Sequence, residues 1–381
     1  MSLIPPSIER LLATVQGVLA GATVLMCMGA AYSASALLQQ NPSWLFAILF
    51  VLAVFFLVVV HEVGHLLAAR MAGMALAGMQ IGPIFLQAKK RGWSVHWSRS
   101  RRPTAGLAIA YPDPTRSLPR QFVLMTIGGP LANVVCAAAF AVPWLLLPNG
   151  PGRIFVAALS LASVFTAMGN LIPTSKFFPS DGFQLLRWHR GVPDDDLGVI
   201  YARVMGRSVF GTTADQLPEG EIAALEAQPP PAQLLGLWFR LKAAQNRREW
   251  TIASALSSRL DAALEAMSSS QVASVSTFVA ILRTEIAFSS AVLDRDSSKL
   301  ESVILSKADA SWARHLPPRI EALRAALAGD VCARDEALAR SAARAAEMPD
   351  LALEKSERSI RASIVALGVG LRVHPDTKAL P

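Results

Sequence analysis

The sequence predicts a mainly α-helical, polytopic membrane protein with four transmembrane helices, a small cytosolic β-sheet insertion and a C-terminal helical domain. Three observations lead to this fold class. The chain of 381 residues has a mean hydropathy of +0.39 and 52% hydrophobic residues, which is too apolar for an ordinary soluble enzyme. Its apolar residues gather in four charge-free stretches. Its excess of Lys and Arg is confined to the first half.

The charge-free stretches have the lengths that membrane spans require. A helix needs roughly 20 apolar residues to cross the hydrocarbon core of a bilayer. Three of the stretches reach this length alone, and the second reaches it if its helix continues to about Ala69. We therefore expect four transmembrane helices. The stretches are Leu11–Leu38, Trp44–Val60, Phe122–Leu147 and Ile154–Ser175.

The first stretch is predicted to be an extra transmembrane helix within residues 1–43. The segment "AYSASA" (Ala31–Ala36) resembles a small-residue cleavage site, so a cleaved signal peptide is the alternative. The apolar run is longer than that of a signal peptide, and the residues before it contain both Glu9 and Arg10. These features favour an uncleaved span.

The distribution of charge predicts the orientation in the membrane. Residues 1–182 contain 12 Lys and Arg against four Asp and Glu, whereas residues 183–381 contain 24 of each. Nine of the basic residues lie between Arg70 and Arg120. The positive-inside rule places that segment, both termini and the second half of the chain in the cytosol. We expect a multi-pass protein of a bacterial plasma membrane, and no nucleic-acid partner for the basic runs.

Residues 75–120, between the second and third spans, are predicted to form the β-sheet insertion. Three segments have the composition of short strands: Met79–Gln87, Trp93–Trp97 and Gly106–Tyr111. The sequence "AKKRG" is typical of a turn between the first two. We expect a small sheet at the cytosolic surface of the membrane.

The composition changes after Pro179, where Ala, Glu, Arg and Leu become dominant. Residues 187–232 are expected to be a linker, because "GTTADQLPEG" and "AQPPPAQ" interrupt the helical pattern. Residues 233–381 are expected to form a cytosolic α-helical domain. Short turns between its helices indicate a tetratricopeptide-like solenoid, with an irregular helical bundle as the alternative. The predicted helices lie near 233–246, 249–267, 270–293, 296–308, 317–328, 332–347 and 351–372.

One motif in the second span carries chemistry. His61, Glu62 and His65 form the pattern H-E-x-x-H on a predicted helix. Positions i and i+4 share one helix face, so the two imidazoles can bind one metal ion. The pattern is the zinc-hydrolase signature, in which Glu is the general base. Three ionisable side chains in a bilayer need some compensation, and a metal provides it. A polar cluster that packs helices together is the alternative.

A third ligand is required, because a catalytic zinc site has three protein ligands and one open position. Asp181 is the only acidic residue between Asp113 and Asp194, and it follows the fourth span directly. Pro173 and Pro179 interrupt the helix before it, and irregular backbone near the membrane suits a cavity. Asp181 is therefore the predicted third ligand, unless it only caps a helix.

These motifs resemble the site-2 protease family of intramembrane zinc metalloproteases. H-E-x-x-H, then "GPLAN" (Gly129–Asn133), then N-x-x-P and D-G occur in the order of that family, within residues 44–186. The resemblance implies Zn²⁺ bound by His61, His65 and Asp181, with Glu62 as the catalytic glutamate. It further implies that Asn170 helps to hold the substrate or the oxyanion. The residues that would shape the site are Gly129, Pro130 and Asn133.

The chain departs from the family pattern in the loop before Asp181. Seven residues separate Pro173 from Asp181, where the family usually has four, and Ser180 replaces a Leu. A bulge of three residues can still return the carboxylate to the metal. Outside the resemblance, His189 is the one further histidine that we consider as an accessory residue.

The predicted activity is hydrolysis of a peptide bond in or beside a transmembrane segment of a membrane-protein substrate, in regulated intramembrane proteolysis. The partners expected are this substrate, the lipid bilayer and a cytosolic protein bound through residues 233–372. The strands between 79 and 111 either capture the substrate by β-augmentation or cover the site. The alternative function is a non-proteolytic, zinc-binding membrane scaffold, although such a site does not need Glu62.

Overall fold

The structure, a computed structural model, describes residues 4–38, 43–97, 106–176, 179–301, 303 and 305–370. The fold is mainly helical, with 73% helix. The described residues form 15 α-helices and one four-stranded antiparallel sheet. The chain divides into two compact units, the first made of residues 1–88 and 93–193 and the second of residues 89–92 and 194–381.

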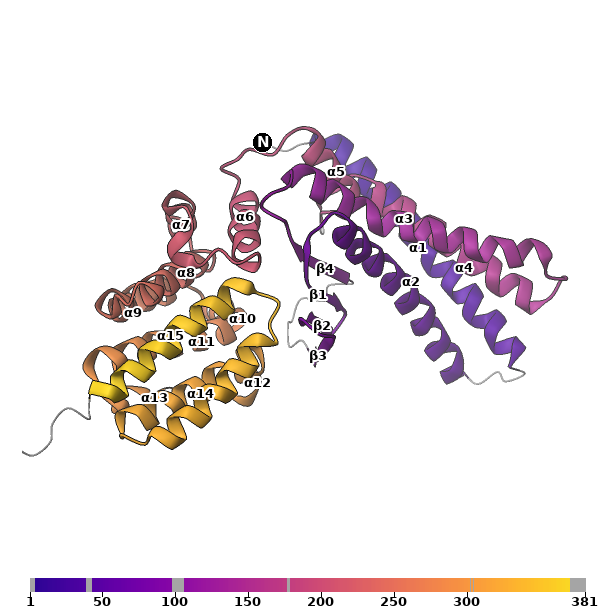
Figure 1. The fold of residues 1–381 in the computed structure, drawn as a ribbon. Coiled ribbons are helices and arrows are strands. Elements are labelled where there is room, and N and C mark those ends of the chain that lie inside the picture. The colour runs from indigo at the N-terminus through magenta and orange to yellow at the C-terminus, as the bar shows by residue number, and fades with distance from the viewer. Residues whose placement is uncertain are drawn as a thin grey trace, which may run out of the picture. The chain divides into compact units, whose positions relative to one another are not determined.

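Four long helices form the body of the first unit. Pairs of them pack along their lengths, with α1 against α4 and α3 against both α2 and α4 (Figure 1). The motif H-E-x-x-H lies on a single continuous helix, α2, which confirms the expected extension beyond Val60. The helices are α1 (Pro6–Leu37), α2 (Ser43–Met71), α3 (Leu118–Leu146) and α4 (Pro151–Leu171).

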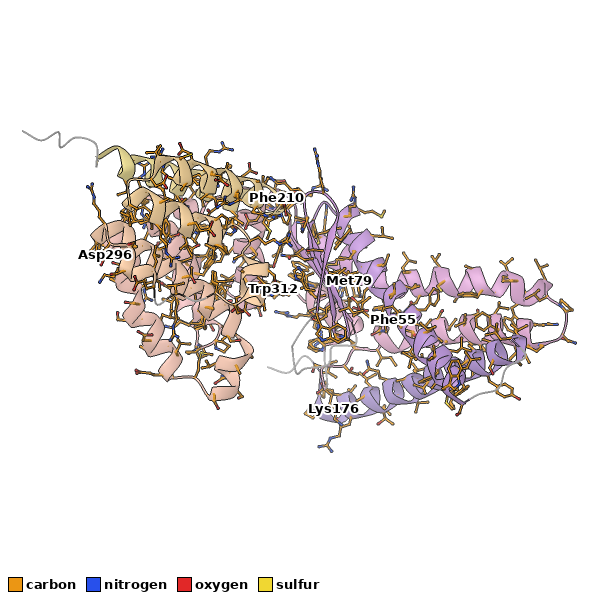
Figure 2. The ribbon with its side chains drawn as sticks, turned by 90° about the horizontal axis from the view of Figure 1, so that it is seen from below. Phe55, Met79, Lys176, Phe210, Asp296 and Trp312 are labelled. Carbon is orange, nitrogen blue, oxygen red and sulfur yellow. The ribbon has the colours of Figure 1, made fainter. Side chains whose placement is uncertain are left out.

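The outer faces of these helices are apolar, as expected for helices in lipid. Figure 2 shows side chains projecting outward along them, with Phe55 labelled, and Phe55 is 40% exposed. By length and composition five helices of the described chain qualify as membrane spans. Four of them are α1–α4, as predicted, and the fifth is α11 (Ser276–Asp294) in the second unit.

The predicted insertion is a sheet with the strand order β3-β2-β1-β4. Met79–Gln87, expected to be one strand, instead belongs to two strands joined at Gly82 and Pro83. Gly82 has a φ of 53°, which glycine adopts readily, and a two-residue turn therefore forms. The strands are β1 (Ala75–Ile81), β2 (Ile84–Ala88), β3 (Trp93–Trp97) and β4 (Gly106–Tyr111).

The sheet packs on α2 near the histidines. Met79 and Ile81 of β1 are buried against Leu66 of α2. At the end of α2, Ala69 joins a second buried cluster with Ala110 of β4. Apolar burial on both sides of the motif therefore holds β1 and the edge strand β4 beside the helix that carries Glu62.

The second unit is entirely helical in its described residues. Consecutive helices pack in pairs, such as α8 with α9 and α13 with α14, while the last helix, α15, also packs on α6 and α8. Units of a linear solenoid contact only their neighbours, so this contact favours the irregular bundle over a linear solenoid. The helices, besides α11, are α6 (Leu197–Val209), α7 (Glu219–Glu226), α8 (Gln233–Asn246), α9 (Trp250–Glu265), α10 (Ser269–Ser274), α12 (Lys307–Trp312), α13 (Leu316–Leu327), α14 (Val331–Ala346) and α15 (Leu351–Gly370).

The structure differs from the sequence prediction at two places in this unit. The expected linker, residues 187–232, contains α6 and α7, whose apolar residues pack with Phe239 of α8 in one core. The prolines that suggested a linker lie between helices rather than between domains. The predicted helix 270–293 is broken at Val275 into α10 and α11. The predicted helix 296–308 is instead a short helical turn, Ser297–Leu300, followed by the start of α12 at Lys307.

A buried ionic network joins four helices of the second unit. Arg319 of α13 donates hydrogen bonds to Glu285 of α11, at 2.5 Å, and to Glu357 of α15. Lys242 of α8 lies 3.1 Å from Glu285. Two cations therefore balance two anions where solvent does not reach, which is the arrangement that buried charges require.

We expect replacement of Arg319 by Met to destabilise the second unit strongly. The change leaves two buried carboxylates with one cation, and removing one partner of a buried ion pair costs about 3–5 kcal/mol. Arg340→Met is the matched control, because Arg340 pairs with Glu321 and Glu336 at the surface, where such pairs contribute about 0–1 kcal/mol. Urea unfolding of the full-length protein, detected by its susceptibility to a protease, measures the stability of both variants. Equal urea midpoints for the two variants would contradict the prediction.

Candidate metal centre and active site

The site begins with a close crossing of α2 and α3. A Cβ atom on Gly64 would lie 2.4 Å from the carbonyl oxygen of Gly128, and one on Gly128 would lie 2.4 Å from that of Gly64. Ala132 and Ala68, four residues further along each helix, face the same crossing. Small residues spaced in this way let two helix backbones approach closely in a membrane. The crossing brings the backbone of α3 within reach of the imidazoles.

The backbone of α3 orients His65. The Nδ1 atom of His65 lies 2.8 Å from the carbonyl oxygen of Met125 and 3.3 Å from the backbone nitrogen of Gly129. The shorter contact fixes the tautomer, because a carbonyl oxygen only accepts a hydrogen bond and Nδ1 must therefore donate. The Nε2 atom keeps its lone pair for a metal. A metal-binding histidine usually donates its other ring N–H in this way.

The side chain of Asn133 holds the second imidazole. Its Nδ2 atom lies 3.0 Å from Nδ1 of His61, and its Oδ1 atom is buried without a hydrogen-bond partner. Turning the amide by 180° places Oδ1 against Nδ1–H, which satisfies both groups. His61 then presents the lone pair of Nε2, as a metal requires.

Gly129 and Pro130, predicted to shape the site, lie on the same turn of α3. A Cβ atom on Gly129 would lie 2.4 Å from Nε2 of His65 and 2.8 Å from Cε1 of His61. Only glycine therefore leaves room for the two rings. Pro130 is buried inside the helix, where its missing N–H cannot donate to the preceding turn.

Asp181 lies at the start of α5 (Asp181–His189), and Ser180 closes the long loop before it. The Oγ atom of Ser180 donates to the carbonyl of Ile172, at 2.6 Å, and accepts from the backbone nitrogens of Thr174 and Phe183. Ser180, which replaces the Leu of the family pattern, thus joins the start and the end of the long loop by hydrogen bonds and caps α5. Gly182 lets α5 begin directly against α4, since its Cβ would lie 1.9 Å from the carbonyl oxygen of Leu171.

His61, His65 and Asp181 converge with the separations of a metal site. The distance is 3.2 Å between the two Nε2 atoms, 3.0 Å from His61 Nε2 to Asp181 Oδ2 and 3.4 Å from His65 Nε2 to Asp181 Oδ1. Ligand atoms about 2.1 Å from a tetrahedral zinc ion lie about 3.4 Å apart. Asp181 Oδ2 is also buried without a hydrogen bond of good geometry. The donor set therefore fits zinc.

Strand β4 passes directly over Glu62. The carboxylate of Glu62 accepts a hydrogen bond from the backbone of Ala108. A Cβ atom on Gly106 would lie 2.2 Å from its Oε1 atom. Glu62 is only 7% exposed. Its carboxylate lies close enough to His61 and Asp181 to interact with their charges. The edge strand thus fixes the carboxylate beside the three candidate ligands.

Asn170 and His189 were also considered for the site, and their surroundings differ from those of the candidate ligands. The amide of Asn170 donates to the carbonyl of Thr166 on its own helix, at 3.1 Å, so its role at an oxyanion stays a prediction. His189 is the last residue of α5, about 12 Å along the helix from Asp181. This distance makes a role for His189 at the metal ligands untenable.

The second unit contains a superficially similar group of Glu285, His315 and Glu357, which are all buried. Arg319 already binds both carboxylates, and Lys242 completes the charge balance. Burial lowers the pKa of His315 and keeps its ring neutral. A divalent cation would add two uncompensated charges, so this group is a structural network.

Comparison with known proteins identifies a family for this chain. Residues 49–292 match the model of Peptidase family M50, the site-2 protease family. Members of this family are membrane-embedded metallopeptidases, usually dependent on zinc. Neither a curated protein nor a solved structure matches the chain.

We expect Gly106→Ala to lower peptidase activity on the order of 10²-fold, the effect of misplacing a reacting group by about 1 Å. The new methyl group would occupy the place of Glu62 Oε1 and displace the carboxylate. The zinc content should not change, because Gly106 does not contact the candidate ligands. Cleavage of a reporter transmembrane peptide and metal analysis measure the two effects.

Gly152→Ala is the matched control for this prediction, since a Cβ atom there meets nothing within 4 Å. Full activity of the Gly106→Ala protein would mean that β4 does not position Glu62.

Proposed function

The chain belongs to Peptidase family M50, and from this membership we propose that it is an intramembrane zinc endopeptidase of the site-2 protease type. Its substrate is a membrane protein, cleaved in or next to a transmembrane segment. The zinc ligands are His61, His65 and Asp181, and the general base is Glu62. The observation that carries the proposal is the convergence of two Nε2 atoms and one carboxylate at 3.0–3.4 Å, with both histidines on α2, a helix apolar enough to span a bilayer.

The reaction assigns each group a separate task. Zinc held by His61, His65 and Asp181 would supply a Lewis acid that activates water and polarises the peptide carbonyl. Glu62 takes a proton from the attacking water and delivers it to the amide nitrogen of the leaving strand. Ala108 N–H keeps the Glu62 carboxylate in place before the water is activated. The Met125 carbonyl accepts from Nδ1–H of His65, and Asn133, with its amide turned so that Oδ1 accepts from Nδ1–H of His61, does the same for the second ring, so that both Nε2 atoms stay unprotonated.

The substrate must present an extended segment to this site. A transmembrane helix satisfies its own backbone hydrogen bonds, so it has to unwind before a peptide bond can be attacked. β4 is an edge strand, since the sheet order places it beside β1 only. An edge strand can pair with an extended peptide. This supports capture of the unwound segment at β4 over a purely covering role for the sheet.

We propose four spans, α1–α4, with residues 70–120, both termini and the second unit in the cytosol. α11 is long and apolar enough to qualify as a fifth span. However, Glu285 in its middle is fully buried and ion-paired to Arg319 and Lys242 of other helices of the same unit. Such a helix belongs to the core of a soluble domain. The second unit, including residues 233–372, would bind a cytosolic protein or the cytosolic part of the substrate and thereby regulate cleavage.

Glu62→Gln tests the proposal. We expect the variant to retain about one zinc ion per chain and to lose activity on the order of 10²-fold or more, because the amide cannot take a proton. His61→Ala should lose the zinc itself. Metal analysis of the purified proteins separates the two effects, and membrane proteomics of cells with the Glu62→Gln protein should reveal accumulated membrane-protein stubs.

Glu265→Gln, an exposed change on α9, is the control and should match the native protein. A fully active Glu62→Gln protein would exclude the general base, and undiminished zinc in a His61→Ala/His65→Ala protein would exclude the metal centre.

The proposed orientation can be measured with a native cysteine. Cys332 at the start of α14 is exposed, whereas Cys27 is buried. We expect a membrane-impermeant maleimide to label Cys332 only after the cells have been opened. Cys332→Ser should remove this labelling, which identifies the reactive thiol. Labelling of Cys332 in intact cells would place the second unit outside the cytosol.

A further inference from the structure

The loop between α4 and α5 delivers Asp181, and it contacts a helix outside the residues that match the family. The match begins at residue 49, whereas α1 ends at Leu37. α1 nevertheless packs along α4. Apolar contacts join the two helices, since Cys27 shares a buried cluster with Ala162, and Ala30 shares another with Ala158.

Gln16 of α1 joins the end of α4 to the first residues of the loop. Its Oε1 atom accepts a hydrogen bond from Thr174 Oγ1, at 2.6 Å, and its Nε2 atom donates to the carbonyl of Gly169, at 3.2 Å. Thr174 is 1% exposed. Gln16 is the only amide side chain in the apolar run Leu11–Leu38. Both ends of its amide form hydrogen bonds, one to Thr174 and one to Gly169.

About two turns earlier on α1, Glu9 binds the next residue of the loop. Its Oε1 atom accepts from Ser175 Oγ, at 2.6 Å, and from the backbone nitrogen of Ser175, at 3.3 Å. Glu9 and Gln16 are seven residues apart, so they lie on the same face of the helix. Together they hold two consecutive loop residues, Thr174 and Ser175.

The same two loop residues lead to the metal ligand. Thr174 exchanges hydrogen bonds with Ser180, since its backbone nitrogen donates to Ser180 Oγ and its carbonyl accepts from the Ser180 backbone nitrogen. Ser180 precedes Asp181 directly and caps its helix. Hydrogen bonds therefore link Gln16 to Thr174 and Thr174 to Ser180. Ser180 is joined by the peptide bond to Asp181, which carries the carboxylate.

We propose that α1 is a positioning helix for the metal centre, acting through Gln16 and Glu9 as positioning residues on the long loop that carries Asp181. A loop three residues longer than the family pattern has more conformations to lose when it places a ligand. The contacts to α1 remove part of that freedom in advance. Hydrogen bonds between helices in a membrane are suited to this, because competing water is scarce.

The proposal rests on the assignment of Asp181 as a metal ligand, and its test has two readouts in the full-length protein. The variant is Gln16→Leu, which keeps the size of the side chain and removes both hydrogen bonds. Thr23→Val is the matched control, because the Thr23 hydroxyl lies on the same helix and bonds only its own turn, at Leu19. Thr174→Val and the double variant complete a thermodynamic cycle.

The first readout uses Co²⁺ as the probe in place of zinc. We expect Gln16→Leu to weaken Co²⁺ binding on the order of 3- to 10-fold and to change its visible absorption, which reports the ligand geometry. Thr23→Val should leave both unchanged. Co²⁺ binding by the double variant should be at most about twofold weaker than binding by Thr174→Val alone, because both changes break the same hydrogen bond between Gln16 and Thr174.

The second readout is amide hydrogen exchange of the peptide that contains Thr174, Ser175 and Ser180, measured without metal. We expect faster exchange there in Gln16→Leu and native exchange in Thr23→Val. Native exchange together with native Co²⁺ binding in Gln16→Leu would overturn the proposal. A native protein that binds no Co²⁺ would instead overturn the metal assignment, and the exchange measurement would still decide whether α1 positions the loop.

Discussion

The close crossing of α2 and α3 at Gly64 and Gly128 is the constraint on which the rest of the site depends. The two helix backbones lie so close there that no Cβ atom fits between them. This close approach places Met125, Gly129 and Asn133 beside the imidazoles. A Cβ atom at either glycine would lie 2.4 Å from a carbonyl oxygen of the other helix, so a side chain there would force the two helices apart. Each histidine would then lose its partner at Nδ1, and its tautomer would no longer be fixed.

The sequence predicted the ionisable residues of the site but missed a contact that depends on the tertiary fold. His61, Glu62 and His65 follow from a fixed helical spacing, and a continuous α2 places them together as expected. Asp181 was predicted as the only acidic residue close after the fourth span, and the structure brings it to both imidazoles. The contact of Gly106 with Glu62 has no local signal, because a glycine that begins a strand is common and only the tertiary fold shows what it faces.

The same reasoning explains the errors in the second unit. Prolines and short polar runs mark the ends of helices, and they look alike in a linker and in a turn between packed helices. Residues 187–232 contain buried apolar positions such as Ile222 and Leu225, which spacing over a short helix such as α7 does not reveal. The hairpin at Gly82 was missed because two apolar strands joined by two residues read as one longer strand.

Among the described residues, the two clusters of possible metal-binding side chains differ in charge, and this difference decides what each can hold. Glu285 and Glu357 meet Arg319 and Lys242, so their charges cancel and the group joins helices without a ligand. Around Asp181 the described residues provide two imidazoles and the further carboxylate of Glu62, but no Lys or Arg is paired with it. A cation that enters this group would balance its negative charge, whereas a cation at the Arg319 network would not. The apolar surroundings of the group around Asp181 therefore favour a bound metal there.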